Sequence, residues 1–501
     1  MPTDDRLRRS WGRDSYRGRM FKILGVVTAA AVALSVPVPA YAAGSVAGGV
    51  VGGVAGSGVD EAAVRRVVED FARSSGYPGI AYALTDGDRL LYADAYGDVT
   101  ARTPMPIASL SKSFTALAAM QLVEAGRIEL DAPAGRYLAG FRTADPRGAA
   151  ITVRQLLNQT SGLSDRGFPE KSLPQPDTLA AAEQRVRGAK LAADPGTAYA
   201  YTNTNYHLVA RIVEVVSGRP FDDYLRENVL RPAGMTSTFS IEQTPRDLPA
   251  GFPDGHVYAY GAAIGATEPK RFVGGSDGVV STAEDMARWL ILQHGQKSLA
   301  SADSFRTMHT PAAGPHSTYA MGWQRDPDGR LHHNGIWFTY TASQLLLPDG
   351  HGVVVLGDSG VGLANEGTDA LADELAAVLS GDRPGGFAPV RLITDLVLAV
   401  FTLLSIILGL RAVRRVVRGE PRPRWTVRRL ARMVVRLWPV AVLLALPALV
   451  GVVFAGRDLT FGQLWYAGPA LVVWLVAAAV VNLTVLGTSL ARRWARPGRV
   501  G

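Results

Sequence analysis

The pattern of apolar and polar residues divides the chain into segments of different kinds. A short apolar run over residues 23–36 follows an Arg-rich start. The middle of the chain mixes helical and strand-like periods. Near the end, residues 392–410, 437–455 and about 465–486 form three apolar runs of bilayer-spanning length. These differences predict a large folded region followed by membrane helices.

The periods of the middle region predict an α/β domain. Val64, Val67 and Phe71 share one side of a predicted helix over 59–75. Two strands flank the hairpin signal Asp86-Gly87-Asp88. Further helices are predicted after Ser109, Tyr201 and Thr282, and strands are predicted over residues 319–324, 331–334, 341–347 and 353–356. Residues 240–280 are rich in glycine and proline and are predicted to be irregular.

The start of the chain is typical of a secretory signal peptide. A basic region, an apolar core and the small-residue site Ala40-Tyr41-Ala42 predict a signal peptide over 1–42, with an uncleaved anchor as the alternative. Residues 43–58 are rich in Gly, Ala and Val and are predicted to be a flexible linker. The folded domain is expected over 59–383.

Charge predicts the orientation of the membrane region. Residues 1–43 carry seven basic and three acidic residues and residues 386–501 sixteen and three, so the stretch between them has a net charge of −9. The loop 411–436 holds ten arginines and one acid. Basic loops face the cytoplasm. We therefore expect a linker over 384–390, three membrane helices over 391–490, a cytoplasmic loop 411–436 and a basic cytoplasmic tail over 491–501.

Composition narrows the chemistry. The chain has no cysteine, which excludes disulfides, thiolate metal sites and cysteine nucleophiles. No His/Asp/Glu group has metal-ligand spacing and no Gly-rich phosphate loop is present. No metal or cofactor is therefore expected, and the basic charge beside apolar runs indicates a lipid bilayer as partner and not nucleic acid.

The stretch from Ile107 to Ala116 carries the clearest candidate chemistry. Ser109 is predicted to lie in the first turn of a helix, and Lys112, three residues on, lies on the same helix face. A serine hydroxyl with an amine beside it is a candidate nucleophile with its proton acceptor. Helix N-terminal N–H groups can stabilise a developing oxyanion.

Several motifs in order resemble one known superfamily. They are Ser109-x-x-Lys112, Thr160-Ser161-Gly162-Leu163, Tyr201-Thr202-Asn203, Ser281-Thr282-Ala283-Glu284-Asp285-Met286 and His333-Asn334-Gly335. Residues 60–380 resemble the serine β-lactamase and penicillin-binding protein superfamily, and are most similar to the class C β-lactamase-related serine hydrolases. The resemblance implies an antiparallel sheet flanked by helices plus a mainly helical subdomain, with the site between them.

The resemblance also implies roles for single residues. Ser109 is the expected nucleophile, and Lys112 and Tyr201 are the candidate proton acceptors. Asn203 is expected to hydrogen-bond Lys112 and the substrate amide. His333 is expected to add either positive charge or a hydrogen bond, and Gly335 lets substrate backbone approach the strand. The backbone N–H groups of Ser109 and Ile336 are the implied oxyanion donors.

Two departures from the superfamily pattern bear on the substrate. Gln159 stands where relatives often have histidine, which predicts different hydrogen bonds in that loop. After Gly335, the bulky run Ile336-Trp337-Phe338-Thr339-Tyr340 replaces two glycines beside the expected oxyanion hole. We expect a narrower and more apolar acyl pocket, which disfavours β-lactam hydrolysis and favours peptides or esters.

The sequence therefore predicts a membrane-anchored, extracytoplasmic serine hydrolase. Its reaction would be acyl transfer through a Ser109 ester to water, on a small peptide, ester, amide or β-lactam-like substrate such as a cell-wall peptide. The alternative is a cell-wall or β-lactam sensor that binds or acylates without turnover. The sequence leaves the oligomeric state open.

Overall fold

The computed structural model describes residues 59–294, 299–312, 317–363, 367–419, 426–453 and 456–494. The predicted signal peptide, the linker 43–58 and residues 495–501 of the predicted tail lie outside the described residues.

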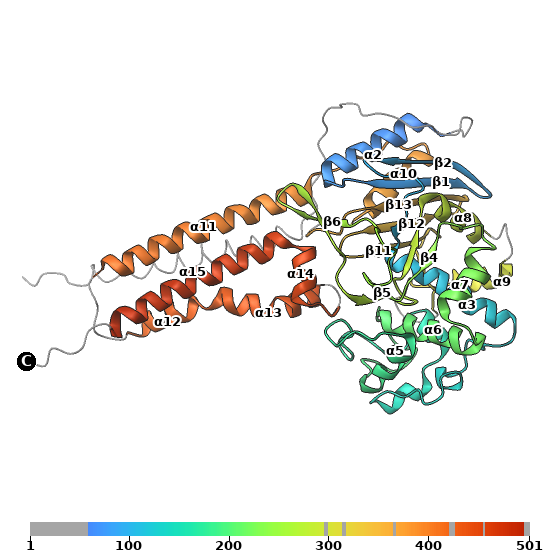
Figure 1. Ribbon diagram of the computed structural model, residues 1–501, viewed down its shortest axis with the longest axis horizontal. Coiled ribbons are helices and arrows are strands. Elements are labelled where there is room, and N and C mark those ends of the chain that lie inside the picture. Colours follow the sequence, from blue (N-terminus) through green and yellow to red (C-terminus); the bar gives the residue numbers. More distant parts are fainter. Residues whose placement is uncertain are drawn as a thin grey trace, which may run out of the picture. The chain divides into compact units, whose positions relative to one another are not determined.

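A six-stranded antiparallel sheet forms the centre of the folded domain, with the order β10-β11-β12-β13-β1-β2 (Figure 1). Two tight turns, at Gly87 with φ of 53° and at Gly350 with φ of 103°, reverse the chain where only glycine is unstrained. The first and last parts of the domain meet where β1 pairs with β13. The strands are β1 Ile80–Asp86, β2 Arg89–Tyr96, β10 Gln324–Arg325, β11 Leu331–Ile336, β12 Thr341–Leu346 and β13 His351–Gly357.

Helices cover both faces of this sheet. Helices α2 (Glu61–Ser75) and α10 (Asp369–Leu379) bury Val64, Phe71 and Leu375 against one face. Helix α8 (Ala283–Gln293) packs on the other face, where Thr282 caps its start by accepting from the Asp285 N–H at 3.1 Å. The predicted α/β architecture with an antiparallel sheet is confirmed.

The second part of the domain is mainly helical and packs around two central helices, α3 and α6 (Figure 1). Its α-helices are α3 Ser111–Glu124, α4 Val153–Leu157, α5 Leu179–Arg185, α6 Asn203–Ser217, α7 Phe221–Leu225 and α9 Ala302–Met308, and a π-helical turn, η5, spans Arg226–Leu230. The short helical turns are η1 Ala108–Leu110, η2 Ala134–Arg136, η3 Pro146–Ala150 and η4 Val186–Gly188.

Short strands complete the domain and correct one prediction. Most of them fall within 240–280, which was predicted to be irregular. Two of them form a local hairpin across Tyr260 and Gly261, and the others are stabilised by pairing with strands distant in the sequence. The strands are β3 Met105–Pro106, β4 Phe239–Ser240, β5 Gln243–Thr244, β6 Gly255–Ala259, β7 Ala262–Ala266, β8 Arg271–Phe272 and β9 Val279–Ser281.

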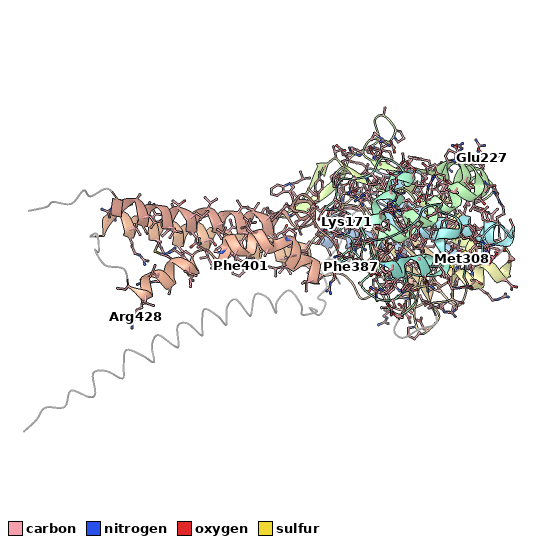
Figure 2. The ribbon with its side chains drawn as sticks, turned by 90° about the horizontal axis from the view of Figure 1, so that it is seen from below. Lys171, Glu227, Met308, Phe387, Phe401 and Arg428 are labelled. Carbon is pink, nitrogen blue, oxygen red and sulfur yellow. The ribbon has the colours of Figure 1, made fainter. Side chains whose placement is uncertain are left out.

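Three helices after the domain are long and apolar enough to cross a membrane, over Val390–Arg418, Leu430–Val453 and Pro469–Arg492. Figure 2 shows side chains standing out along this region, with Phe401 and Arg428 among them. The region comprises α11 Val390–Arg418, α12 Val427–Val435, α13 Trp438–Val453, α14 Phe461–Ala467 and α15 Pro469–Trp494.

One detail of the predicted membrane region differs. Trp465 lies in the separate short helix α14 and not at the start of the third span. Asp395, in the first turns of α11, is 6% exposed and accepts a hydrogen bond from the Tyr260 N–H at 2.6 Å. The folded domain therefore covers this acid.

Candidate active site

Ser109 lies at a sharp turn between β3 and α3. The turn is the three-residue helix η1, Ala108–Leu110, so Ser109 comes just before α3 and not inside its first turn as predicted. Ala108 has φ of 48°, a left-handed value that is costly for a residue with a side chain. Ser111 holds the turn closed by donating to the Ala108 carbonyl at 2.5 Å and accepting from the Val279 N–H at 2.9 Å. Ser111 is thus a structural neighbour of Ser109.

Lys112 points from α3 at the Ser109 hydroxyl. Its amine donates to Ser109 Oγ at 3.0 Å, to the Ser276 carbonyl at 3.0 Å and to Asp277 Oδ1 at 3.1 Å. An ammonium has three N–H donors, and these three acceptors use them all. The fully buried lysine amine is therefore held next to the serine by contacts in three directions.

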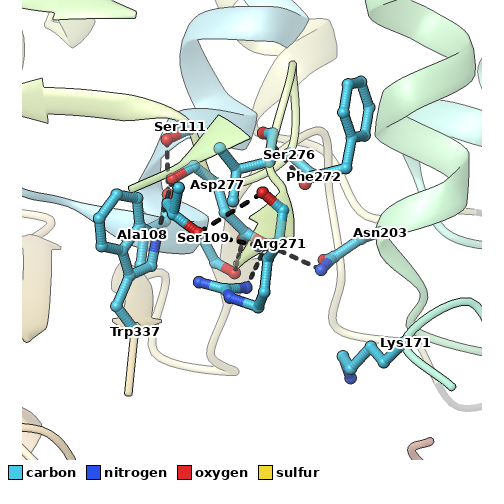
Figure 3. A network of polar contacts seen from close by, with 12 residues as sticks. Ala108, Ser109, Ser111, Lys171, Asn203, Arg271, Phe272, Ser276, Asp277 and Trp337 are labelled. Carbon is cyan, nitrogen blue, oxygen red and sulfur yellow. Dashed lines mark hydrogen bonds and ion pairs between the residues drawn. The ribbon is translucent and has the colours of Figure 1, made fainter. Parts of the chain in front are cut away.

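Asp277 is the centre of the polar network (Figure 3). Its carboxylate accepts from Ser109 Oγ at 2.7 Å and from Asn203 Nδ2 at 2.7 Å, in addition to the Lys112 contact. The Trp337 indole N–H donates to its backbone carbonyl at 3.0 Å. Burial opposes the charged form, yet the cations of Lys112 and Arg271 hold the pKa of Asp277 well below its usual range. Asp277 therefore orients Ser109 and Lys112 and is a weak base.

Asp277 was not among the site residues predicted from the sequence. It lies in the run Gly274-Gly275-Ser276-Asp277-Gly278, between β8 and β9, within the region predicted to be irregular. An acidic residue within a glycine-rich run was the available signal for a site residue, because glycine lets two backbone segments approach closely. Gly275 illustrates this, since a Cβ there would lie 2.3 Å from the Ala210 Cβ on α6.

Tyr201 stands beside this network at the start of α6. Its ring centroid lies 5.0 Å from Lys112 Nζ and 6.1 Å from the ring centroid of His333. Among the described residues, its hydroxyl makes no hydrogen bond to Ser109 or Lys112. Catalytic hydrogen bonds are often long in unliganded sites. A catalytic role for Tyr201 stays a prediction.

Gln159 explains how the start of α6 is held. Its side-chain oxygen accepts from the Thr202 N–H at 3.2 Å and from Asn205 Nδ2 at 2.6 Å. The residue itself has φ of 61°. These hydrogen bonds tie the loop to the segment that carries Tyr201 and Asn203. A glutamine amide makes them here, at the position where relatives often have histidine.

His333 lies on β11, and its ring centroid is 6.1 Å from that of Tyr201. Burial and then the Lys112 cation lower the pKa of His333 to about 3, which favours the neutral ring at neutral pH. A neutral ring fits the second of the two expected contributions, a hydrogen bond. Its Nε2 lies 3.2 Å from the hydroxyl of Tyr319, a buried residue that the sequence analysis placed only in a strand.

Gly335 lies where β11 approaches the nucleophile turn. A Cβ at Gly335 would lie 2.3 Å from the Ile107 carbonyl oxygen and 3.1 Å from the Ala108 Cβ. Ile336 ends the strand and its side chain is exposed, whereas the next residue, Trp337, is fully buried and turned toward Asp277. The missing side chain at 335 therefore keeps the strand edge close to Ser109.

Comparison with known proteins identifies the family. The sequence profile of the Beta-lactamase family matches residues 64–378, which is more than half of the chain. The chain belongs to the Beta-lactamase family. The membrane region lies beyond the matched residues.

Relatives in this family are distant. Protein flp of Staphylococcus aureus (strain N315) is 25% identical over 317 residues, which cover 58% of this chain and 62% of that protein. The putative penicillin-binding protein PbpX of Bacillus subtilis (strain 168) is 27% identical over 300 residues, covering 58% of this chain and 72% of that one. The chain thus spans less than two thirds of the length of flp.

Solved structures share the fold. The octameric penicillin-binding protein homologue from Pyrococcus abyssi superposes with a TM-score of 0.55 at 24% identity, covering 71% of this chain and 82% of that one. Members of the superfamily are serine hydrolases that include penicillin-binding proteins and amidases. At this identity the likeness supports the fold, and the substrate must be argued from the site.

Proposed function

We propose that the chain is a membrane-anchored serine hydrolase in which Ser109 is acylated by a peptide, ester or amide substrate and then deacylated by water. The observation that carries the proposal is the buried contact of Ser109 Oγ with Lys112 Nζ at 3.0 Å and with Asp277 Oδ1 at 2.7 Å. A hydroxyl held between a fixed cation and a fixed carboxylate is oriented before substrate arrives.

The proton path of this proposal runs to Tyr201. Lys112 uses all three N–H groups as a donor, so in this geometry it has no lone pair to accept the Ser109 proton. Tyr201, whose ring centroid lies 5.0 Å from the amine nitrogen, is the remaining candidate acceptor. The phenol would then return the proton to the leaving group, while Lys112 stays charged throughout.

Other groups of the site are proposed to bind the substrate. Asn203 Oδ1 is buried and has no hydrogen-bond partner among the described residues, which suits it to accept from a substrate amide N–H. The backbone N–H groups of Ser109 and Ile336 remain our proposed oxyanion donors. The bulky residues after Gly335 favour peptide or ester substrates over β-lactams in this proposal.

The proposed topology puts the catalytic domain outside the cell. Three apolar helices follow the domain, and the Arg-rich stretch 411–436 lies between the apolar parts of the first two; it contains the end of α11 and the whole of α12, so the predicted loop is helical at both ends. By the positive-inside rule this loop and the C-terminus face the cytoplasm. A site anchored at the outer surface suits cell-wall peptides or nearby esters.

The test is labelling of the full-length chain by a fluorophosphonate serine probe. Ser109→Ala should abolish labelling while the thermal unfolding temperature stays close to that of the wild type. Ser113→Ala is the matched control, because Ser113 lies on the same helix and donates only to the Leu110 carbonyl at 2.8 Å. Labelling that persisted in Ser109→Ala would require another nucleophile.

Turnover separates the hydrolase from the sensor. An aryl ester, a D-Ala-D-Ala peptide and a chromogenic cephalosporin should be compared with the full-length chain. We expect more than one product equivalent per protein from the ester or the peptide and slow cephalosporin turnover. A single equivalent from every substrate would favour the sensor, and fast cephalosporin turnover would contradict the expected acyl pocket.

A further inference from the structure

An arginine from the membrane region lies against the candidate proton acceptor. Arg457 belongs to the short connection between α13 and α14, and its guanidinium carbon lies 4.9 Å from the ring centroid of Tyr201. Its Nε lies 2.9 Å from Asp165 Oδ2, and the side chain is 23% exposed. Lys112 Nζ lies 5.0 Å from the same ring. Two cations therefore approach one phenol, one from the catalytic helix and one from beyond the family-matched region.

The connection that carries Arg457 is anchored by several polar contacts. The Asp458 N–H donates to Asp165 Oδ2 at 3.0 Å, and the Asp458 carboxylate accepts from the Ser172 N–H at 2.6 Å and the Ser172 hydroxyl at 2.5 Å. Lys171 Nζ donates to the Asp458 carbonyl at 3.2 Å. These contacts fix the backbone at the residue after Arg457, and the ion pair with Asp165 holds the side chain, so Arg457 is held in place and is not a free surface side chain.

Asp165 is the acid that receives this connection. It is buried, in the loop that follows Gly162. Burial would raise its pKa, but the cations of Arg457 and Lys171 hold the pKa of Asp165 below its ordinary value. The carboxylate thus stays charged in a buried place, and its ion pair with the guanidinium holds Arg457 beside the ring of Tyr201.

A second arginine, Arg391, also joins the C-terminal helices to the folded domain, at a place away from the site. It serves as a reference for Arg457. Arg391, near the start of α11, is buried and donates to the Ser75 and Gly360 carbonyls at 3.0 Å each. Its guanidinium carbon lies 4.2 Å from the ring centroid of Tyr258. This junction joins the same two regions with the same type of residue, but it has no contact with Ser109, Lys112 or Tyr201 among the described residues.

We infer that Arg457 is a positioning residue of the proposed hydrolase: it sets the ring of Tyr201 and stabilises negative charge on the phenol oxygen, so that the membrane region completes the active site. A guanidinium close to an aromatic ring is attracted to it. An opposite charge within about 4–6 Å favours the ionised form of a group. The inference rests on the proposed function, because it assigns Arg457 a part in the proton transfer from Ser109.

Other charged or titratable groups surround the ring, and the effect of Arg457 must be measured against them. His333 is neutral, and Lys112 is paired with Asp277. The groups around Tyr201 and its two cations are Lys112, Asp165, Glu170, Lys171, Tyr199, Tyr206, Arg271, Asp277, Tyr319 and His333. Of these, only Lys112 is a second cation within 6 Å of the ring, so removing Arg457 leaves one cation in place of two.

The experiment measures kcat/KM for a soluble aryl ester against pH, with full-length chain in lipid nanodiscs. In Arg457→Gln the acidic limb of the profile, which reports the proton acceptor, should move up by about one pH unit or more. Each unit lowers the rate tenfold at pH values below the limb. Arg457→Lys keeps the charge and should restore the limb to within about half a unit of the wild type.

Arg391→Gln is the matched control, since it weakens the same junction of regions away from the site. We expect it to lower the unfolding temperature and to leave the limb where the wild type has it. An unchanged limb in Arg457→Gln, or a limb in Arg457→Lys displaced as far as in Arg457→Gln, would overturn the inference.

The controls also separate this inference from the proposed function. If Ser109→Ala abolishes ester hydrolysis by the full-length chain, the hydrolase proposal stands and the Arg457 variants test only the positioning role. If Ser109→Ala hydrolyses the ester as the wild type does, the proposed function has failed, and the assignment of Arg457 to its proton transfer fails with it.

Discussion

Replacing Asp277 by asparagine removes the negative charge that the Ser109, Lys112 and Asn203 side chains contact. The new side chain has nearly the same shape. The carboxylate is 2% exposed and accepts from Ser109, Lys112 and Asn203, with Arg271 Nη1 at 3.8 Å from Oδ2. An amide has one acceptor and one donor end. Either its NH₂ group faces the Asn203 donor or it faces the donors of Ser109 and Lys112, so one side of the network must break.

The expected loss of unfolding free energy follows from Lys112, which stays buried but loses its carboxylate partner. Removing one partner of a buried ion pair costs about 3–5 kcal/mol, and the retained amide oxygen puts Asp277→Asn at about 3. For a folded domain over residues 59–383 that is roughly 4–5 °C in unfolding temperature. Because Ser109 loses its orientation as well, the acylation rate should fall about 100-fold beyond the loss of folded protein.

The assay compares thermal unfolding with the rate of fluorophosphonate labelling per folded molecule. Asp285→Asn is the matched control: Asp285 is equally buried, accepts from the Ser237 N–H at 2.9 Å and the Thr238 hydroxyl at 2.8 Å, and pairs with Arg288 at 2.7 Å away from the site. It should lose stability and keep its labelling rate. A wild-type labelling rate in folded Asp277→Asn would refute the reasoning.

Two further predictions concern packing and pH. Gly335→Ala places a methyl group 2.3 Å from the Ile107 carbonyl and should cost about 1–3 kcal/mol in chemical denaturation and slow acylation, whereas Gly265→Ala, where a Cβ meets nothing within 4 Å, should do neither. Burial and then Asp222 raise the pKa of Glu242 from 4.5 to about 7, so the folded state holds a proton that the unfolded state releases. The stability that this proton contributes is complete below about pH 4.5 and is lost as pH rises through 7. In Glu242→Gln the fall in unfolding free energy between pH 5 and pH 8 should be smaller by about 1–2 kcal/mol; this value is reduced because Glu242 is partly exposed. Urea unfolding of both proteins at the two pH values measures the difference.

Equal stability in Gly335→Ala and Gly265→Ala would show that β11 can move away from the nucleophile turn at no cost. Parallel stability curves for the wild type and Glu242→Gln between pH 5 and pH 8 would show that this carboxyl titrates in the folded protein as it does in the unfolded chain.

Local spacing in the sequence determined much of this protein. The three-residue interval from Ser109 to Lys112 placed hydroxyl and amine together because helical turns repeat at that distance. Apolar length alone located the three candidate spans, since crossing a bilayer needs about 20 apolar residues. Alternating periods located the strands of the sheet, and the ordered motifs indicated the family.

Tertiary structure alone decided what surrounds those residues. Asp277 reaches Ser109 across 168 positions of sequence, and Asp458 meets Ser172 across 286. Arg457 reaches Tyr201 from a different region of the chain. No periodic pattern links such distant positions, because their meeting depends on how the sheet closes between β1 and β13 and on how the C-terminal apolar helices follow the domain. The spacing of residues along a helix or strand sets only contacts within that element, so the carboxylate and the second cation of the site could be found only in the folded chain.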